Sequence, residues 1–154
     1  MTMLVVDALA ALVEVEQAMA VYYRWLAEVF EGDPDARACF RELADQEQSH
    51  ATQISLQHRM VRSAKLTDEV ELERAKIEAV RTSIARFREQ NPEPPLSHAV
   101  LFAARLESGE IEQAYRNLLN TSSPQLAGFV KGMIRADEKH AEKLRELMAK
   151  KKVG

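Results

Sequence analysis

The chain has 154 residues, of which 46% are hydrophobic and 29% charged, as expected for a folded globular protein of about one domain. Five glycines and five prolines are too few for the turn-rich all-β folds, which are excluded. The net charge of −3 excludes a general attraction to nucleic acid or anionic membranes, and the single cysteine, Cys39, excludes a disulfide framework or a CxxC metal module.

The N-terminal segment is apolar, but it contains Asp7, Glu14 and Glu16. A signal peptide or a membrane-spanning helix would not tolerate these charges. We therefore expect a cytoplasmic protein that neither enters a membrane nor binds nucleic acid.

Four long helices are predicted, over residues 4–31, 34–62, 96–119 and 124–149. The first ends near Gly32, a common helix terminator, and Asp33 is expected to cap the second, with Pro34 at its first position. Ser123 and Pro124 begin the last helix. Short turns join the first two helices and the last two, so each pair is predicted to form an antiparallel hairpin.

The crossover between the hairpins, residues 63–95, is long enough to run the length of a bundle. Thr67, followed by two acidic residues, is expected to cap a further helix within it. This helix carries an apolar stripe at helical spacing, formed by Val70, Ile77, Val80, Ile84 and Phe87. The connectivity predicts an all-α ferritin-like four-helix bundle, with residues 1–154 as a single domain.

Acidic residues interrupt the apolar face of every long helix, although most other charges fall on solvated faces. In chain order these acids are Glu16, Glu47, Glu107 and Asp137. The last three are each followed three residues later by another candidate ligand, which is His50, Glu110 and His140 respectively.

Burying these acids requires a compensating positive charge, because an unpaired buried carboxylate costs several kcal/mol and neighbouring carboxylates repel one another. No matching set of lysines or arginines faces inward in the predicted bundle. Metal ions are the natural compensation. With Glu110 included there are five carboxylates, so two divalent ions, or two trivalent ions joined by an oxide, leave a net charge of −1.

The spacing of the ligands also favours metal. Residues three apart on a helix lie about 60° from each other, so Glu47 and His50 can reach one ion, and Asp137 and His140 can do the same. One acid from each of two helices and an acid-x-x-His pair from each of the others is the constellation of di-iron and di-manganese bundles. A donor set of oxygens with one imidazole per metal suits iron, with manganese as an alternative, and the lack of thiolates disfavours structural zinc.

The sequence resembles the rubrerythrin branch of the ferritin-like superfamily over nearly all four long helices. The resemblance is carried by Glu16 with Tyr23 seven residues later, by Glu47-Gln48-Ser49-His50, and by Glu107-Ser108-Gly109-Glu110 followed by Tyr115. Ferritins and bacterioferritins typically have one ligand in the third motif, whereas rubrerythrins have two. In rubrerythrins, the second of these two ligands exchanges with the histidine of the second helix as the iron changes oxidation state. The resemblance therefore implies that Glu110 and His50 are the exchanging pair.

This resemblance implies a non-haem di-iron peroxidase that reduces hydrogen peroxide to water, with two iron ions bridged by an oxide when oxidised. The implied catalytic residues are Glu110, His50 and Tyr23. The implied metal ligands are Glu16, Glu47, His50, Glu107, Glu110, Asp137 and His140. Because the cysteine count excludes a rubredoxin-like domain, electrons are expected from a separate donor such as a rubredoxin. Similar proteins are usually homodimers or larger assemblies, in some cases with helices exchanged between chains.

The sequence also departs from the family pattern. Asp137 stands where the family normally has glutamate, so a metal bridge at that position is expected to be altered or replaced by terminal binding. No methionine lies between Glu47 and His50, which disfavours a haem-binding bacterioferritin. A ferroxidase or oxidase that uses O₂, an iron-storage cage and a structural metal site remain as alternatives.

Three further residues allow two interpretations each. Tyr23 and Tyr115 are expected either to act on the site carboxylates, by hydrogen bonding or electron donation, or to serve as core residues. Gly109 costs about 1 kcal/mol inside a helix. It therefore indicates either the close approach of another backbone or a π-bulge.

Overall fold

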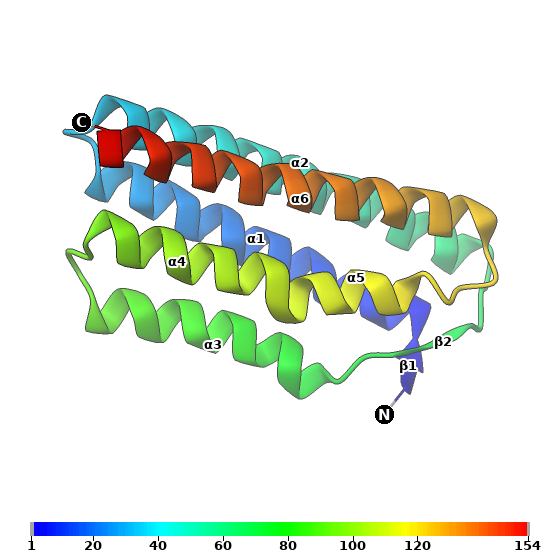
Figure 1. The fold of residues 1–154 in the computed structure, drawn as a ribbon. Coiled ribbons are helices and arrows are strands. Elements are labelled where there is room, and N and C mark those ends of the chain that lie inside the picture. The colour runs from blue at the N-terminus through cyan, green and yellow to red at the C-terminus, as the bar shows by residue number, and fades with distance from the viewer. Residues whose placement is uncertain (1, 154) are drawn as a thin grey trace.

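The computed structural model describes residues 2–153, with side chains for residues 2–151, and it is an elongated bundle of helices (Figure 1). The bundle consists of α1 (Val5–Val29), α2 (Pro34–Ser63), the consecutive segments α4 (Leu96–Leu106), η1 (Glu107–Ile111) and α5 (Glu112–Leu118), and α6 (Pro124–Val153). A further helix, α3 (Arg74–Gln90), runs along the outside of the bundle beside α4. The predicted order of hairpin, long crossover and hairpin is confirmed.

The helix starts follow the local sequence signals. The Asp33 side chain accepts a hydrogen bond of 3.2 Å from the backbone N–H of Ala36, and Pro34 is the first residue of α2. The Ser123 hydroxyl accepts a hydrogen bond of 3.3 Å from the N–H of Leu126 in the first turn of α6. Both predicted starts are confirmed. None of the helices within residues 2–153 has the length and apolar character needed to cross a membrane.

The start of the crossover differs from the prediction. It contains the short strand β2 (Glu69–Glu71), which pairs antiparallel with β1 (Thr2–Leu4), and α3 begins only at Arg74. The predicted helix start at Thr67 is therefore wrong. The reason is Asp68, whose carboxylate accepts hydrogen bonds from the backbone N–H of Ser122 and from the hydroxyls of Thr121 and Ser122. This contact holds the chain extended across the end of the bundle.

The rest of the predicted apolar stripe packs as expected. Ile77, Val80 and Ile84 are buried where α3 covers the bundle. Phe87 stacks on Phe102 of α4, with ring centroids 4.3 Å apart. α3 therefore covers one side of the bundle and excludes water from it.

The third long helix is not continuous, because the π-helix η1 interrupts it. Gly109 lies at its centre with φ −99° and ψ −113°, outside helical values. No atom lies within 4 Å of the place where a Cβ on Gly109 would stand, leaving aside its chain neighbours and the helix's own nearby backbone. Of the two interpretations of this glycine, the π-bulge is confirmed and close backbone approach is not.

We expect the change Asp68→Ala to lower the free energy of unfolding by about 1–2 kcal/mol, because it removes the acceptor that joins β2 to the α5–α6 loop. Hydrogen bonding, chiefly from the Ser122 N–H, lowers the pKa of Asp68 and keeps it ionised at neutral pH. Urea unfolding at pH 7 would measure the change, with Asp45→Ala at an exposed position of α2 as the control. Equal stability of the two variants would contradict a structural role for this contact.

Candidate metal centre

Six acidic and histidine side chains meet in the middle of the bundle, each with less than a tenth of its surface exposed. They are Glu16 from α1, Glu47 and His50 from α2, Glu107 from η1, and Asp137 and His140 from α6. We call them the acid–histidine cluster. No lysine or arginine is buried within the part of the chain whose side chains are described. The structure thus buries the acids of all four long helices and both histidines close together in the middle of the bundle, while their role as metal ligands stays a prediction.

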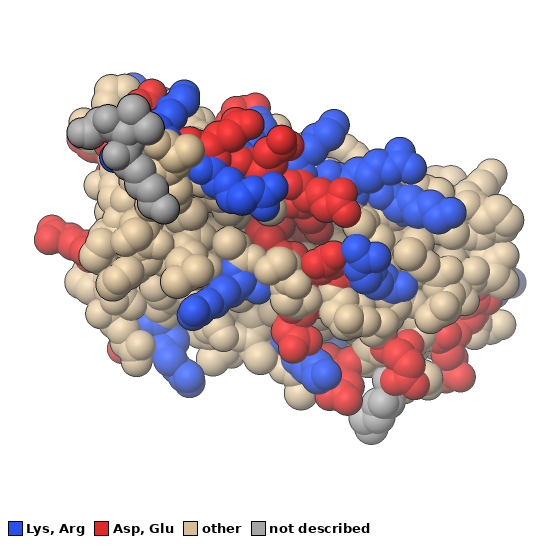
Figure 2. Space-filling model, viewed as in Figure 1, with Lys and Arg blue, Asp and Glu red and all other residues tan. Residues whose placement is uncertain are grey.

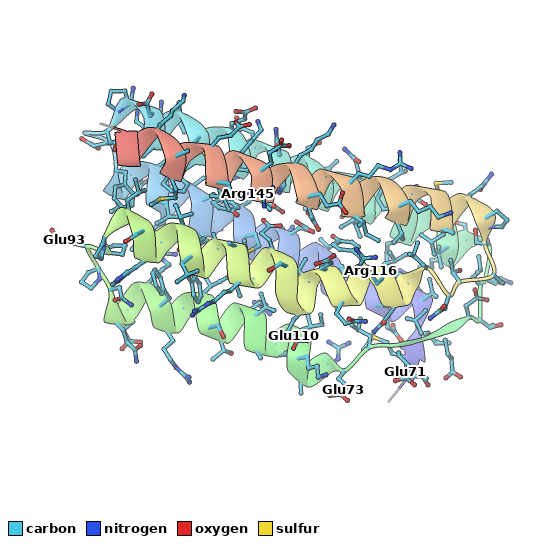
Figure 3. The ribbon with its side chains drawn as sticks, viewed as in Figure 1. Glu71, Glu73, Glu93, Glu110, Arg116 and Arg145 are labelled. Atoms are coloured by element: carbon cyan, nitrogen blue, oxygen red, sulfur yellow. The ribbon has the colours of Figure 1, made fainter. Side chains whose placement is uncertain are left out.

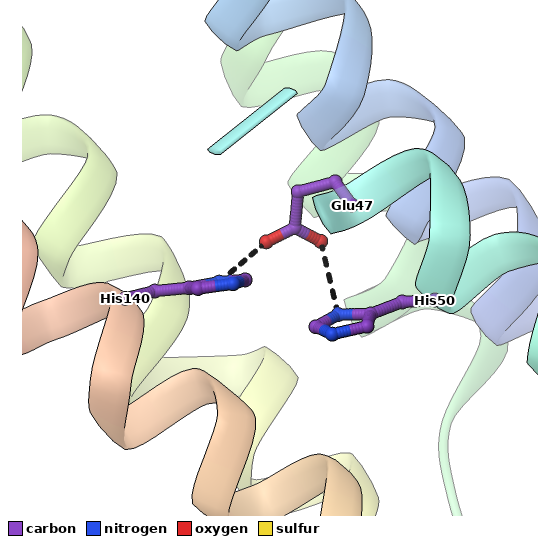
Figure 4. A group of neighbouring side chains, drawn as sticks. All are labelled: Glu47, His50 and His140. Carbon is purple, nitrogen blue, oxygen red and sulfur yellow. Dashed lines mark ion pairs between the residues drawn. The ribbon is translucent and has the colours of Figure 1, made fainter. Parts of the chain in front are cut away.

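Glu47 lies between the two histidines (Figure 4). Its Oε1 atom is 2.8 Å from Nδ1 of His140, and its Oε2 atom is 3.9 Å from Nδ1 of His50. The two imidazole rings are nearly parallel, with centroids 5.2 Å apart and an angle of 16° between their planes. One carboxylate therefore faces an imidazole with each of its oxygens, so Glu47 and both histidines offer their donor atoms to one shared space.

The other acids surround this centre. Nδ1 of His140 is 3.5 Å from Oε1 of Glu107 and 3.9 Å from Oδ1 of Asp137. Nδ1 of His50 is 4.0 Å from Oε2 of Glu16. The donor atoms form three overlapping groups, and within each group all of them lie within 4.8 Å of one another. The groups are Glu47, His50 and His140; Glu47, Glu107, Asp137 and His140; and Glu16, His50 and Asp137.

Two buried tyrosines hold the outer carboxylates by hydrogen bonds that cross the bundle. The Tyr23 hydroxyl of α1 donates to Oε1 of Glu107 over 3.0 Å. The Tyr115 hydroxyl of α5 donates to Oε1 of Glu16 in a short hydrogen bond. Burial, together with the neighbouring carboxylates, raises the pKa of both hydroxyls, so both remain protonated donors. The hydrogen-bonding interpretation is therefore confirmed for both residues.

Several buried polar atoms of the cluster have no hydrogen-bond partner, and this shows whether the cluster suits a metal ion. They are both carboxylate oxygens of Glu47 and of Asp137, and Nδ1 of His50 and His140. Glu47 and His140 are close, but their relative orientation does not make a hydrogen bond. Unsatisfied lone pairs that converge in a buried space suit a cation, and four carboxylates with two imidazoles suit iron or manganese.

The electrostatics of the cluster reflect this lack of positive charge. Burial and the nearby carboxylates raise the pKa of Asp137 to about 10 and that of Glu47 well above its ordinary range. Burial alone would also raise the pKa of Glu107, but its interactions with His140, Glu47 and Tyr23 lower it. Burial and the neighbouring His140 lower the pKa of His50 to about 4. Without metal the site therefore holds protons on acids such as Asp137 and Glu47, and a metal must displace them.

Glu110, predicted as a ligand and as the partner of His50 in a ligand exchange, does not join the cluster. Its side chain is exposed on the side of η1 that faces α3 (Figure 3), where it lines a cavity with Glu73 and Lys76. The physical reason is the π-helix. Each residue in it turns through a smaller angle than the 100° of an α-helix, so the third residue after Glu107 lies well away from it. This structure therefore provides four carboxylates at the site, and not five.

A protein-family model described as Rubrerythrin matches residues 7–148, which include every member of the acid–histidine cluster. Neither the curated proteins nor the solved structures that were searched contain a match to the chain.

The metal-free protein should lose stability as the pH rises from 7.5 to 8.5. The pKa of Asp137 is raised from 3.8 to about 10, so the folded state binds more protons than the unfolded state across this interval. Stability then falls with pH, by at most about 1.4 kcal/mol per pH unit for this group. His50 does not oppose the trend here, because it is neutral in both states above pH 7.5. Urea unfolding at both pH values measures the slope.

Two controls belong to this experiment. Asp137→Asn should have a shallower slope, and the metal-loaded protein should be flatter still, because its carboxylates are already ionised. A metal-free protein whose stability rises between pH 7.5 and 8.5 would show that these acids are not buried.

Metal analysis after expression in iron-rich medium should distinguish Glu110 from Glu107. We expect Glu110→Ala to retain the metal content of the unaltered chain, because this side chain is outside the cluster. Glu107→Ala should lose metal, because it removes a buried ligand. If Glu110→Ala lost metal to the same extent, Glu110 would have to reach the site in solution.

Proposed function

We propose, because this chain belongs to the rubrerythrin family, that its acid–histidine cluster binds two iron ions and reduces hydrogen peroxide to water. The observation that supports this most directly is the convergence of unsatisfied carboxylate and imidazole atoms from four helices in a buried space. Family membership supports a di-iron protein with oxidoreductase chemistry. The peroxidase reaction and the number of two ions are our proposal.

Six residues of the cluster would hold the two ions, three at its centre and three around them. Glu47, His50 and His140 would hold the ions at the centre of the cluster, since each oxygen of Glu47 faces one imidazole ring. Glu16, Glu107 and Asp137 would complete the two donor sets. When bound, the two ions supply the two electrons that, with two protons, convert hydrogen peroxide into two water molecules.

The protein's own groups fix this donor set and keep it dry. Tyr23 and Tyr115 each hold one oxygen of a carboxylate, which leaves the other oxygen of Glu107 and Glu16 for metal. The buried side chains around the cluster exclude bulk water, which strengthens its electrostatic interactions. A separate electron donor, for which we propose a rubredoxin, would restore the reduced state.

A ferroxidase that uses O₂ is the second candidate, and the position of Glu110 favours it. The second ligand of the third motif is the feature that separates the rubrerythrin pattern from that of ferritins. In this structure Glu110 is exposed and outside the cluster. The remaining donor set is therefore closer to the ferritin pattern, in which the third motif supplies a single ligand.

The peroxidase and the ferroxidase can be distinguished by the oxidant with which the iron-loaded protein reacts faster. We expect the anaerobically iron-loaded protein to be oxidised faster by hydrogen peroxide than by O₂ in parallel stopped-flow mixes. Metal analysis should give about two iron ions per chain. The double variant Glu47→Ala with His50→Ala is the control, and it should bind no iron and show no reaction. Faster oxidation by O₂ would reject the peroxidase in favour of the ferroxidase, and tight metal binding without turnover would indicate a structural site.

A further inference from the structure

A cavity of about 200 Å³ lies between η1 and α6, and two members of the acid–histidine cluster line it. Its deep end is formed by the buried carboxylates of Glu107 and Asp137. Ala141 of α6 lines it further out, and the exposed Glu138 and Arg145 stand at its rim. Four further cavities along the described chain are lined by no member of the cluster.

Asp137 is the side chain that points to a ligand in this cavity. It has 6% of its surface exposed, and neither of its oxygens has a hydrogen-bond partner. A carboxylate in this state costs free energy unless a cation or a proton reaches it. Because Asp137 belongs both to the cavity and to the cluster, whatever reaches it from this side also reaches the metal-binding atoms.

The lining of the cavity is acidic as a whole, because four carboxylates (Glu107, Glu112, Asp137 and Glu138) face a single cation, Arg145. Figure 2 shows acidic side chains gathered at the centre of this face, where α6 runs beside η1. Glu112 lines the cavity but is paired with Arg116, whose Nη2 atom lies 2.7 Å from its Oε1 atom. Glu138 is exposed and stands one residue after Asp137 along α6. Negative charge at the mouth of a narrow cavity raises the local concentration of cations and their rate of association.

We propose that this cavity is the access route to the acid–histidine cluster for divalent metal ions and for hydrogen peroxide, with Glu138 attracting the cation at the mouth. The part that concerns the peroxide rests on the proposed function. The part that concerns the cation rests only on the cluster and the cavity. The π-helix forms one wall of the route through Glu107 and Ser108, and α6 forms the other.

The first experiment blocks the route and measures how fast metal enters. Metal-free full-length protein is mixed with Co²⁺ in a stopped-flow instrument, and the rise of the cobalt absorbance is followed. Ala141→Phe places a large side chain in the cavity and should slow Co²⁺ binding by an order of magnitude or more. The Co²⁺ content reached at equilibrium should not change. Ala149→Phe, at an exposed position of the same helix, is the matched control and should bind Co²⁺ at the unaltered rate.

A second variant keeps the test valid if the first variant does not fold. Ser108→Leu narrows the cavity from the opposite wall and should slow Co²⁺ binding in the same way. If both variants bind Co²⁺ to the full extent and at the unaltered rate, the metal reaches the cluster elsewhere and the proposal is wrong.

The third variant tests the charge at the mouth. Glu138→Gln should slow Co²⁺ binding several-fold at low ionic strength, and this difference should disappear in high salt. The oxidation of iron-loaded protein by hydrogen peroxide should not change in this variant, because the peroxide is neutral, whereas Ala141→Phe should slow it. Glu142→Gln, exposed on the same helix and outside the cavity lining, is the control.

The outcomes separate this proposal from the proposed function. If hydrogen peroxide does not oxidise the iron of the unaltered protein, the peroxidase fails, but the Co²⁺ experiment still decides the access route. If Glu138→Gln slows Co²⁺ binding and oxidation by hydrogen peroxide equally, or slows neither, the proposal that its charge attracts the cation is wrong.

Discussion

The structure depends on one electrostatic constraint, which is that four carboxylates are buried together with no buried lysine or arginine among the described side chains to balance them. Removal of a carboxylate from water costs several kcal/mol, and each neighbour adds repulsion. The metal-free chain can meet this cost only by keeping protons on some of these acids. A bound cation would offset this cost, so metal affinity and the stability of the bundle are linked.

The two tyrosines show how the bundle holds these acids at one depth. Tyr23 stands seven residues after Glu16 but donates to Glu107, and Tyr115 stands eight residues after Glu107 but donates to Glu16. Seven residues return an α-helix to nearly the same face, and eight do not. The π-helix absorbs the extra residue between Glu107 and Tyr115, so the second pair regains the geometry of the first. The same bulge explains why sequence spacing alone left the role of Tyr115 open.

Features that depend on one helix at a time could be predicted from the sequence. The caps at Asp33 and Ser123, and the acids that interrupt apolar stripes, follow from local periodicity. The strand β2 could not be predicted, because it depends on β1 more than sixty residues away and on the bonds of Asp68 to residues 121 and 122. The exposed position of Glu110 could not be predicted, because it depends on the π-helix, and the sequence left the π-bulge at Gly109 as one of two interpretations.

The π-helix also changes the charge balance of the site. With Glu110 outside, two divalent ions would bring four carboxylates to neutrality, whereas five would leave a net charge of −1. On the proposed function, oxidation of both ions would then add two positive charges, which a buried site could balance only by releasing protons or by admitting anions such as hydroxide. A fifth buried carboxylate would have balanced one of these two positive charges from within the protein. A path for protons or water between the cluster and solvent is therefore a requirement of a four-carboxylate site. The cavity beside η1, at the bulge that turns Glu110 outward, is placed to provide it.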